Sequence, residues 1–387
     1  MRSCFNVCQN RLFEIPFEKV ELYSTYSLPH SLKSKALQLV LYLALGKIMV
    51  VLPVLALAHS ASALYGLGTK WDANYYELIA THGYGSATAP YVFSPVYPAV
   101  IKLIYSAIGN AWVSALLVTN VLSFVFPILL YRGFGYRTAL FAELFPTYLV
   151  FTTVAYSDVI ALIFLAASLL FLMRGEIVRS SLAASAAIFS FFSLTWTLSS
   201  FIFGISRRRL ARGALFYAFP IVTGCLILLW FKLGTGSYFS FFRLEAPWGA
   251  GFANPVAQAL YLLCAQGQGS FTCQPWAVLG VSLPPSYWLA RNALFEGFYL
   301  FGALYLLRTD CGHRVFLGAY CISVSAPLLF VVGVPALSIP RLLLPAFPVF
   351  LGYSSLLKGK FSEDCYFIAC MLLAAAISVV QYYAFFA

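Results

Sequence analysis

The chain has 387 residues, of which 61% are hydrophobic and only 10% are charged. A soluble domain carries roughly 25% charged residues, so this composition excludes a soluble fold and indicates a protein whose solvent is the bilayer. The formal net charge is +11, and its basic residues lie in short segments between apolar runs. That distribution is typical of a membrane protein and argues against nucleic-acid binding.

The apolar runs predict an all-α, polytopic transmembrane bundle of about eleven spans. The runs are 36–58, 111–131, 138–152, 157–173, 180–192, 196–206, 213–232, 291–308, 315–334, 341–357 and 364–385. Several are shorter than the ~20 residues of a perpendicular span, so we expect those helices to tilt or to be buried among neighbours. The first run follows a long polar tail and is too long for a signal peptide. We therefore predict a cytoplasmic tail over 1–35 and one membrane domain over 36–387.

The basic residues orient this bundle. With the N-terminus inside, the predicted internal segments and helix ends hold 17 of the 24 lysines and arginines, as the positive-inside rule requires. The segment 180–206 is the one difficult step, because a single span there would place Arg207–Arg209 outside. Two short helices that meet near 193–196 at the outer face restore the rule, and we prefer that arrangement.

This topology leaves two large external loops, 59–110 and 233–290. Each contains a stretch that predicts an interfacial or re-entrant helix, one starting near Tyr97 and one near Pro255. The second loop also holds Cys264 and Cys273, which could form a disulfide on the oxidising side of the membrane. The other cysteines show no metal-binding spacing.

The first external loop contains the segment WDANYYELIATHGYG, which starts at Trp71. Asp72 and Glu77 are its acidic residues, and a carboxylate near the membrane is costly enough that it usually has a function. Carboxylates among aromatic rings suit sugar binding, because rings stack on the C–H faces of a sugar while a carboxylate accepts from its hydroxyls or removes a proton. The alternative is that Asp72 caps a helix over 73–80. The surrounding rings are Trp71, Tyr75, Tyr76, Tyr84 and Tyr97.

His82 follows the predicted short helix. It could bind a phosphate, bind a metal or transfer a proton, although a histidine at a helix end is more often structural. Gly83 then suits the position that ends the helix.

Three further charged positions stand out. Asp158, in AYSDVIALIFL, lies at the outer start of a span, where it could interact with the helix dipole or face the same external cavity as Asp72. Glu143 lies within a span and needs a partner or neutralisation. Arg341, in IPRLLLPAFPVF, lies at an outer helix end, where it could bind an anionic headgroup through its guanidinium. Arg291 and Glu296 are expected to form an ion pair.

The order of these motifs resembles a known family. WD…Y…IA.HGY is followed by FSPVYP, then by YSD at 156–158, and late in the chain by R.LLP.FP at 341–348. This resembles the PIG-V family, the second mannosyltransferase of glycosylphosphatidylinositol-anchor assembly, and its prokaryotic relatives in the GT-C superfamily. The motif at 71–98 is the most specific part of the resemblance, and the other two are weak alone.

The resemblance implies a membrane glycosyltransferase that takes a mannose-type sugar from dolichyl-phosphate mannose and transfers it to a lipid-linked or glycan acceptor on the non-cytoplasmic face. It implies that Asp72 is the general base, that Asp158 is a second catalytic acidic residue, and that Arg341, with His82, contacts the donor phosphate. The aromatic residues and Glu77 would bind substrate. A divalent metal and a small membrane partner subunit are left open.

Two departures bear on the acceptor and the host. FSPVYP stands where the family usually has an aromatic-aromatic-Pro pattern, and SLTWTLSS, around Trp196, stands where the family often carries an R-x-N-G-like motif. They favour a prokaryotic, archaeal cell membrane over the endoplasmic reticulum. The absence of GxGxxG and DxD patterns argues against a soluble nucleotide-sugar donor.

The competing function is a polytopic lipid or solute transporter, or flippase, which would use intramembrane charges such as Glu143 and Lys47. A scaffold subunit without activity is a third alternative. The chain shows no inverted repeat and few charges within the spans. Its polar residues gather on the predicted outer side, which favours an enzyme that acts on a lipid substrate.

Overall fold

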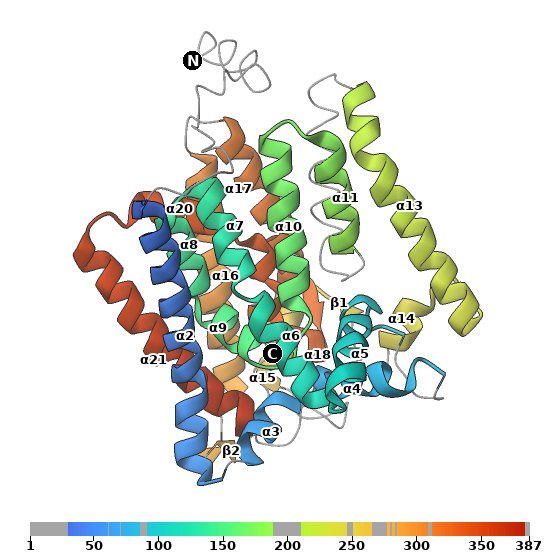
Figure 1. The fold of residues 1–387 in the computed structure, drawn as a ribbon, viewed down its shortest axis with the longest axis horizontal. Helices are drawn as coiled ribbons and strands as arrows, with labels where there is room; N and C mark the ends of the chain where they lie inside the picture. Colours follow the sequence, from blue (N-terminus) through green and yellow to red (C-terminus); the bar gives the residue numbers. More distant parts are fainter. Residues whose placement is uncertain are drawn as a thin grey trace.

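The structure is a computed structural model, and it describes residues 30–60, 62–69, 71–85, 91–188, 210–245, 251–264, 277–278, 281–282, 285–308 and 312–383. Helices make up almost all of the described chain, which confirms the all-α fold class (Figure 1). Two antiparallel pairs of two-residue strands are its β-structure. They join β1 (Gly251–Phe252) to β4 (Val331–Val332) and β2 (Ala277–Val278) to β3 (Val281–Ser282).

The first long helix is α2 (His30–Ala58), and one of its faces is buried while the other is exposed. Leu39, Leu43, Val50 and Val54 are buried, at the spacing of four and seven residues that places side chains on one helical face. Apolar side chains such as Leu41 and Leu52 are exposed. A face of exposed leucines on a 29-residue helix is what contact with lipid requires.

Three short helices follow at the lower end of the molecule in Figure 1: α3 (Ser62–Thr69), α4 (Asp72–His82) and α5 (Val96–Ile108). Gly83 and Gly109 end α4 and α5 at positive φ, and each backbone N–H bonds the carbonyl four residues earlier, as glycine allows. The predicted helix near Tyr97 is therefore present as α5. The first large loop is a folded helical layer.

The centre of the bundle consists of α6 (Ala111–Leu122), α7 (Val125–Phe134), α8 (Tyr136–Glu143), α9 (Pro146–Thr153) and α10 (Asp158–Met173). Pro146 begins α9, and the chain breaks between α8 and α9 where proline cannot continue a helix. The predicted span over 138–152 is thus two short helices. Every residue of α9 is buried, because other helices surround it.

The remaining helices cover this centre. They are α11 (Ile177–Ile188), α13 (Leu210–Thr235), α14 (Ser240–Glu245), α15 (Pro255–Cys264), α16 (Pro285–Leu307), α17 (Gly312–Ser325), α18 (Val334–Leu337), α19 (Ile339–Leu342), α20 (Val349–Leu356) and α21 (Lys360–Tyr383), with the 3-10 turns η2 (Ala326–Phe330) and η3 (Leu344–Ala346). The α15 helix matches the prediction near Pro255. The proposed pair of helices over 180–206 lies largely outside the described residues, as does the proposed Cys264–Cys273 disulfide.

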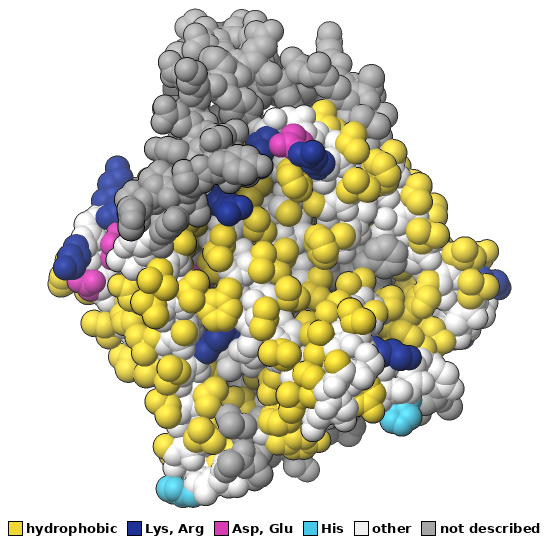
Figure 2. All heavy atoms as spheres, viewed as in Figure 1, with side chains coloured by type: hydrophobic (Ala, Val, Ile, Leu, Met, Phe, Trp, Pro, Cys, Tyr) yellow, Lys and Arg dark blue, Asp and Glu magenta, His cyan; other side chains and the backbone are white. Residues whose placement is uncertain are grey.

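Apolar side chains cover most of the face shown in Figure 2. The acidic side chains on this face, and most of its Lys and Arg side chains, lie in the upper half. Four described helices are long and apolar enough to span a membrane: Ser34–Ala58, Ala111–Phe134, Ala218–Thr235 and Lys360–Tyr382. A fifth candidate is the pair Ile339–Ala346 and Val349–Leu356, which is bent by 77°. The chain is an integral membrane protein. The count of about eleven spans and the division at residue 35 stay predictions.

Candidate active site

Three charged residues from distant parts of the chain meet in one cluster, which we call the Arg341 cluster: Arg341, Asp72 and Asp158. Arg341 Nη1 donates to Asp72 Oδ2 at 2.5 Å, and Arg341 Nε lies 3.4 Å from Asp158 Oδ1. The side chains of Arg341 and Asp158 are 10% and 4% exposed, whereas that of Asp72 is 26% exposed. The cluster is buried on the Asp158 side and open on the Asp72 side, so an incoming molecule would meet Asp72 first.

Asp72 is the first residue of α4, and the residue before it has an unusual backbone conformation. Trp71 has φ 60° and ψ −127° and makes no side-chain capping bond. A bulky residue with positive φ is strained, and such strain is held only where surrounding contacts fix it. Asp72 does not act as the cap of the helix over 73–80. Its carboxylate is instead turned to Arg341.

Asp158 is the first residue of α10 and is buried at the outer start that the sequence indicates. Its Oδ1 faces Arg341, while Oδ2 has no hydrogen-bond partner among the described residues. A buried carboxylate oxygen without a partner is uncommon and calls for a ligand, a water or a function. Asp158 therefore has one oxygen committed to Arg341 and one without a described partner.

Arg341 lies in α19, within the bent pair Ile339–Ala346 and Val349–Leu356. Pro340 stands beside it inside this one-turn helix. Two rings face the guanidinium, Tyr156 with its centroid 5.0 Å from Cζ and Phe151 with its centroid 6.0 Å away. Cation–π contacts of this kind stabilise a desolvated cation and fix the plane of the guanidinium.

Aromatic packing connects α4 to the start of α10. Tyr76 is buried, and its hydroxyl lies 2.7 Å from Ser157 Oγ. Its ring packs edge-on against Phe93 and Tyr97 at centroid distances of 5.2 and 4.9 Å. Both carboxylates of the Arg341 cluster therefore belong to segments that Tyr76 joins.

Tyr97 is also fully buried, and its hydroxyl lies 2.6 Å from Thr119 Oγ1 and donates to Ala115 O at 3.1 Å. The substrate-binding role predicted for Tyr76 and Tyr97 does not fit this burial. Both residues hold α4 and α5 against α6 and α10 instead. A tyrosine hydroxyl can bind a substrate or a protein group, and burial determines which of the two it contacts.

The more accessible predicted residues lie along α4 and just after it. Tyr75 is half-buried and stacks on Phe93 at 5.0 Å. Tyr84 donates its hydroxyl to Phe93 O at 2.6 Å, and its ring lies 4.9 Å from that of Tyr91. Trp71 is half-buried and packs against the core. These rings border the open side of the layer and remain candidates for contact with a sugar.

His82 is not part of the Arg341 cluster. It is exposed at the last turn of α4, and its Nδ1 lies 2.7 Å from Thr81 Oγ1. Ten residues of helix, at 1.5 Å per residue, separate it from Asp72 by about 15 Å along the axis. The structure therefore separates His82 from Arg341, with which the sequence had grouped it.

Glu77 is half-buried on α4, and its Oε1 has no hydrogen-bond partner among the described residues. Desolvation raises the pKa of this carboxyl to about 7, because burial disfavours its charged form. Burial likewise raises the pKa of Tyr84 above its usual value. Glu77 thus titrates near neutral pH, separately from the Arg341 cluster.

Three charged residues elsewhere, Arg291, Glu296 and Glu143, do not have the partners that the sequence analysis expected. Arg291 is buried and donates to Asn292 Oδ1 at 2.8 Å and to Leu337 O at 2.6 Å. Glu296 is buried too, with an Oε1 that has no described hydrogen-bond partner, so the expected Arg291–Glu296 ion pair is wrong. Glu143 is fully buried with neither oxygen hydrogen-bonded to a described residue, so the partner expected for it is not found there.

A metal site is not evident in the described part of the chain, where three or more His, Cys, Asp or Glu side chains do not gather in any one place. The Arg341 cluster has a cation of its own between its two carboxylates. In the described geometry the guanidinium occupies the position that a divalent ion would take between them.

The sequence prediction missed the residues that complete the cluster. Tyr156 and Ser157 belong to the YSD motif, so a signal for them existed. Phe151 lies in an apolar run with no mark of its own, and only the packing of α9 against α19 reveals it.

No protein-family model and no curated protein matches the sequence. Among solved structures, the crystal structure of ArnT from Cupriavidus metallidurans bound to undecaprenyl phosphate is similar, with a TM-score of 0.50 and 17% identity over 88% of this chain and 64% of that chain. The apo structure of the same ArnT gives a TM-score of 0.48 and 16% identity over 87% and 63%. This chain therefore spans less than two thirds of the length of ArnT. The chain therefore has a fold similar to that of ArnT.

Proposed function

We propose that this protein is a membrane glycosyltransferase that transfers a sugar from a polyprenyl-phosphate donor to an acceptor hydroxyl on the non-cytoplasmic face. The observation that carries the proposal is the Arg341 cluster, in which an arginine lies between two acidic residues. The fold shared with ArnT, which was crystallised with undecaprenyl phosphate, supports the class of donor. The PIG-V-like motifs support dolichyl-phosphate mannose as the specific donor.

In this mechanism the Asp72 carboxylate accepts the proton of the acceptor hydroxyl, and the acceptor oxygen forms a bond to the anomeric carbon. The bond between that carbon and the phosphate oxygen breaks, and the polyprenyl phosphate leaves with the electron pair. One base and one displacement invert the anomeric centre, as in other single-displacement glycosyl chemistry. General base catalysis of this kind contributes roughly 10²–10⁴-fold.

Arg341 must change partners for this reaction. While Arg341 Nη1 donates to Asp72 Oδ2, that oxygen is engaged and must be released before it can accept the proton of the acceptor hydroxyl. The donor phosphate offers better acceptors for a planar guanidinium. We propose that the phosphate takes the Nη side of Arg341, that Asp158 keeps hold of the Nε side, and that Asp72 is released toward the acceptor.

The test is transfer of labelled mannose from dolichyl-phosphate mannose to added lipid acceptors by the purified, reconstituted protein. We expect Asp72→Asn to lower the rate by about 10²–10⁴-fold. The matched control is Glu176→Gln, because Glu176 pairs with Arg179 in an exposed ion pair on another part of the chain. A folded Asp72→Asn protein with the rate of the parent would overturn the assignment of Asp72. Movement of lipid between leaflets without a glycosylated product would favour the transporter.

A further inference from the structure

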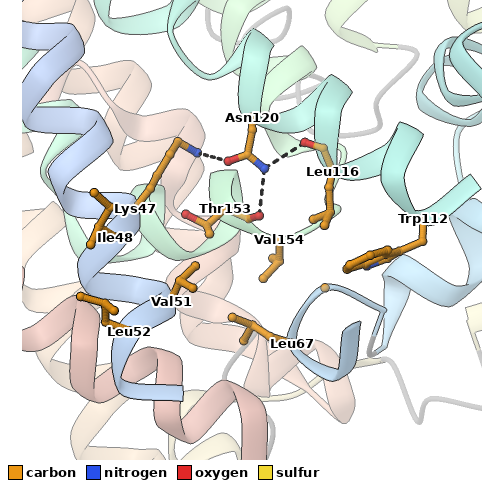
Figure 3. Close-up of a pocket in the computed structure, with 11 residues that line it drawn as sticks. Lys47, Ile48, Val51, Leu52, Leu67, Trp112, Leu116, Asn120, Thr153 and Val154 are labelled. Atoms are coloured by element: carbon orange, nitrogen blue, oxygen red, sulfur yellow. Dashed lines mark hydrogen bonds between the residues drawn. The ribbon is translucent and has the colours of Figure 1, made fainter. Parts of the chain in front are cut away.

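A cavity of about 400 Å³ opens between α2, α3, α6 and the end of α9 (Figure 3). This volume is in the range of sites that bind small molecules. Its walls are mostly apolar, and none of the three Arg341-cluster residues lines it. The lining residues are Lys47, Ile48, Val51, Leu52, Leu67, Gly68, Trp112, Leu116, Asn120, Thr153 and Val154.

The polar end of this cavity is already satisfied. Lys47 Nζ donates to Asn120 Oδ1 at 2.9 Å and also contacts the carbonyl and hydroxyl oxygens of Thr152. Asn120 Nδ2 donates to Leu116 O at 2.9 Å and to Thr153 O at 3.1 Å (Figure 3). An ammonium has three donors, so Lys47 is matched by protein oxygens. The cavity therefore offers mostly hydrocarbon contacts and no charge set aside for a headgroup, and its one unpaired polar atom among the described lining residues is Trp112 Nε1.

The cavity is lined by residues of two candidate spans, Ser34–Ala58 and Ala111–Phe134. Ile48 and Leu52 on its rim are exposed, and so is Leu117 next to it. From Trp112 to Asn120 it follows eight residues of α6, about 12 Å at 1.5 Å per residue. One leaflet of a ~30 Å hydrocarbon core is about 15 Å deep. The length of the cavity matches a chain that enters from one leaflet.

We propose that this cavity binds an acyl chain of a phospholipid from the leaflet on the same side as the Arg341 cluster. The chain would touch both segments that carry the acidic residues. Gly68 lies four residues before Asp72, and Val154 lies four residues before Asp158. A Cβ at Gly68 would lie 2.9 Å from Trp112 Nε1, so a larger residue there would push the Trp112 side chain at this wall aside. The bound acyl chain would thus pack against the segments that precede Asp72 and Asp158.

The test uses the full-length protein in nanodiscs that contain a phosphatidylcholine with a diazirine in its acyl chain. After irradiation and proteolysis, mass spectrometry locates the lipid adducts. We expect adducts on the α2 and α6 residues of the cavity. Leu116→Trp fills the cavity and should lower them several-fold, whereas Leu117→Trp, on the neighbouring lipid-facing position, should not. Excess polyprenyl phosphate should leave the labelling unchanged.

If Leu116→Trp fails to fold, Ile48→Trp on the α2 wall repeats the comparison. Its control is Leu45→Trp, at an exposed position of the same helix. Equal labelling of cavity-filling and control variants would show that the chain does not enter the cavity, and would overturn the proposal. Loss of labelling on addition of polyprenyl phosphate would assign the cavity to the polyprenyl chain and would overturn it as well. Neither result depends on sugar transfer, so the glycosyltransferase proposal is tested separately.

Discussion

Arg341 is the residue on which the candidate site depends, because it neutralises two acidic residues that would otherwise repel each other. Its guanidinium reaches both, and the rings of Tyr156 and Phe151 cover it. A lysine has a compact ammonium and lacks the planar fork that presents separate Nε and Nη donors to two carboxylates. We therefore expect Arg341 to hold the two acidic segments together, in addition to the phosphate contact that we propose for it.

Removing the guanidinium should destabilise the protein. We expect Arg341→Met to lower the free energy of unfolding by about 3–5 kcal/mol, because the buried Asp158 then loses its counter-charge. Adding Asp158→Asn to Arg341→Met should recover part of the loss. The measurement is unfolding of the purified protein in one detergent, followed by tryptophan fluorescence. A double variant no more stable than Arg341→Met would show that the two charges do not interact.

Glu77 gives the site a pH dependence of its own. Its pKa of about 7 in the folded protein lies above the ordinary 4.5 of a glutamate. The folded protein therefore holds a proton that the unfolded chain releases, and stability falls as the pH rises from about 4.5 to about 7. We expect Glu77→Gln to raise the melting temperature at pH 8 and to change it little at pH 4.5. A pH-independent difference between the two proteins would contradict this prediction.

At the scale of helices, close packing depends on small residues where two backbones approach. Gly318 on α17 faces α16, and a Cβ there would lie 2.8 Å from Ala303 O and 3.0 Å from Leu307 N. Glycine lets membrane helices approach this closely. Gly297, on α16, has open space where its Cβ would be.

These two glycines make a matched pair. We expect Gly318→Ala to destabilise the protein by about 1–3 kcal/mol, because backbone must move to make room. Gly297→Ala should leave stability unchanged or raise it by up to about 1 kcal/mol, since alanine favours the helix. Thermal unfolding in detergent measures both. Similar losses for the two variants would mean that the α16–α17 contact is not the cause.

The strain at Trp71 belongs to the junction of α3 and α4. Because glycine adopts positive φ without strain, Trp71→Gly can keep the backbone that directs Asp72, whereas Trp71→Ala keeps the strain of a Cβ and loses the indole contacts that hold it. Both variants lose the indole equally. We expect Trp71→Gly to retain more transfer activity than Trp71→Ala in the mannose assay. The reverse order would show that this backbone conformation does not position Asp72.

At the scale of the whole molecule, the Arg341 cluster and the predicted internal arginines lie toward opposite ends of the helical bundle. The α4 helix lies in the lower half of Figure 1, and in Figure 2 the acidic side chains and most of the Lys and Arg side chains on the visible face lie in the upper half. The bundle between these ends is covered by exposed leucines, isoleucines and valines. This arrangement fits an orientation with the candidate site on the non-cytoplasmic face.

That orientation can be measured with cysteines placed at the two ends. In a cysteine-free background, we expect His82→Cys to react with a membrane-impermeant maleimide added to intact cells, and Arg179→Cys to react only after the membrane is opened. Both side chains are exposed, so each is accessible to the reagent. Labelling of the Arg179 position in intact cells would reverse the topology.

The sequence by itself determined that the molecule is a helical membrane protein, and it singled out the three residues that form the Arg341 cluster. Charged groups are so costly in a bilayer that apolar runs and isolated polar residues are visible without a structure. For the same reason Asp72, Asp158 and Arg341 stand out, although 269 positions separate the first from the last.

Only the tertiary structure decided how these residues meet. Whether Asp72 caps its helix or binds Arg341 depends on a contact across the bundle, which no local pattern encodes. The same is true of the burial of Tyr76 and Tyr97, of the distance of His82 from Arg341, and of the failure of Arg291 to pair with Glu296. Side-chain chemistry limits what a residue can bind, but packing between distant helices selects the partner from those that remain.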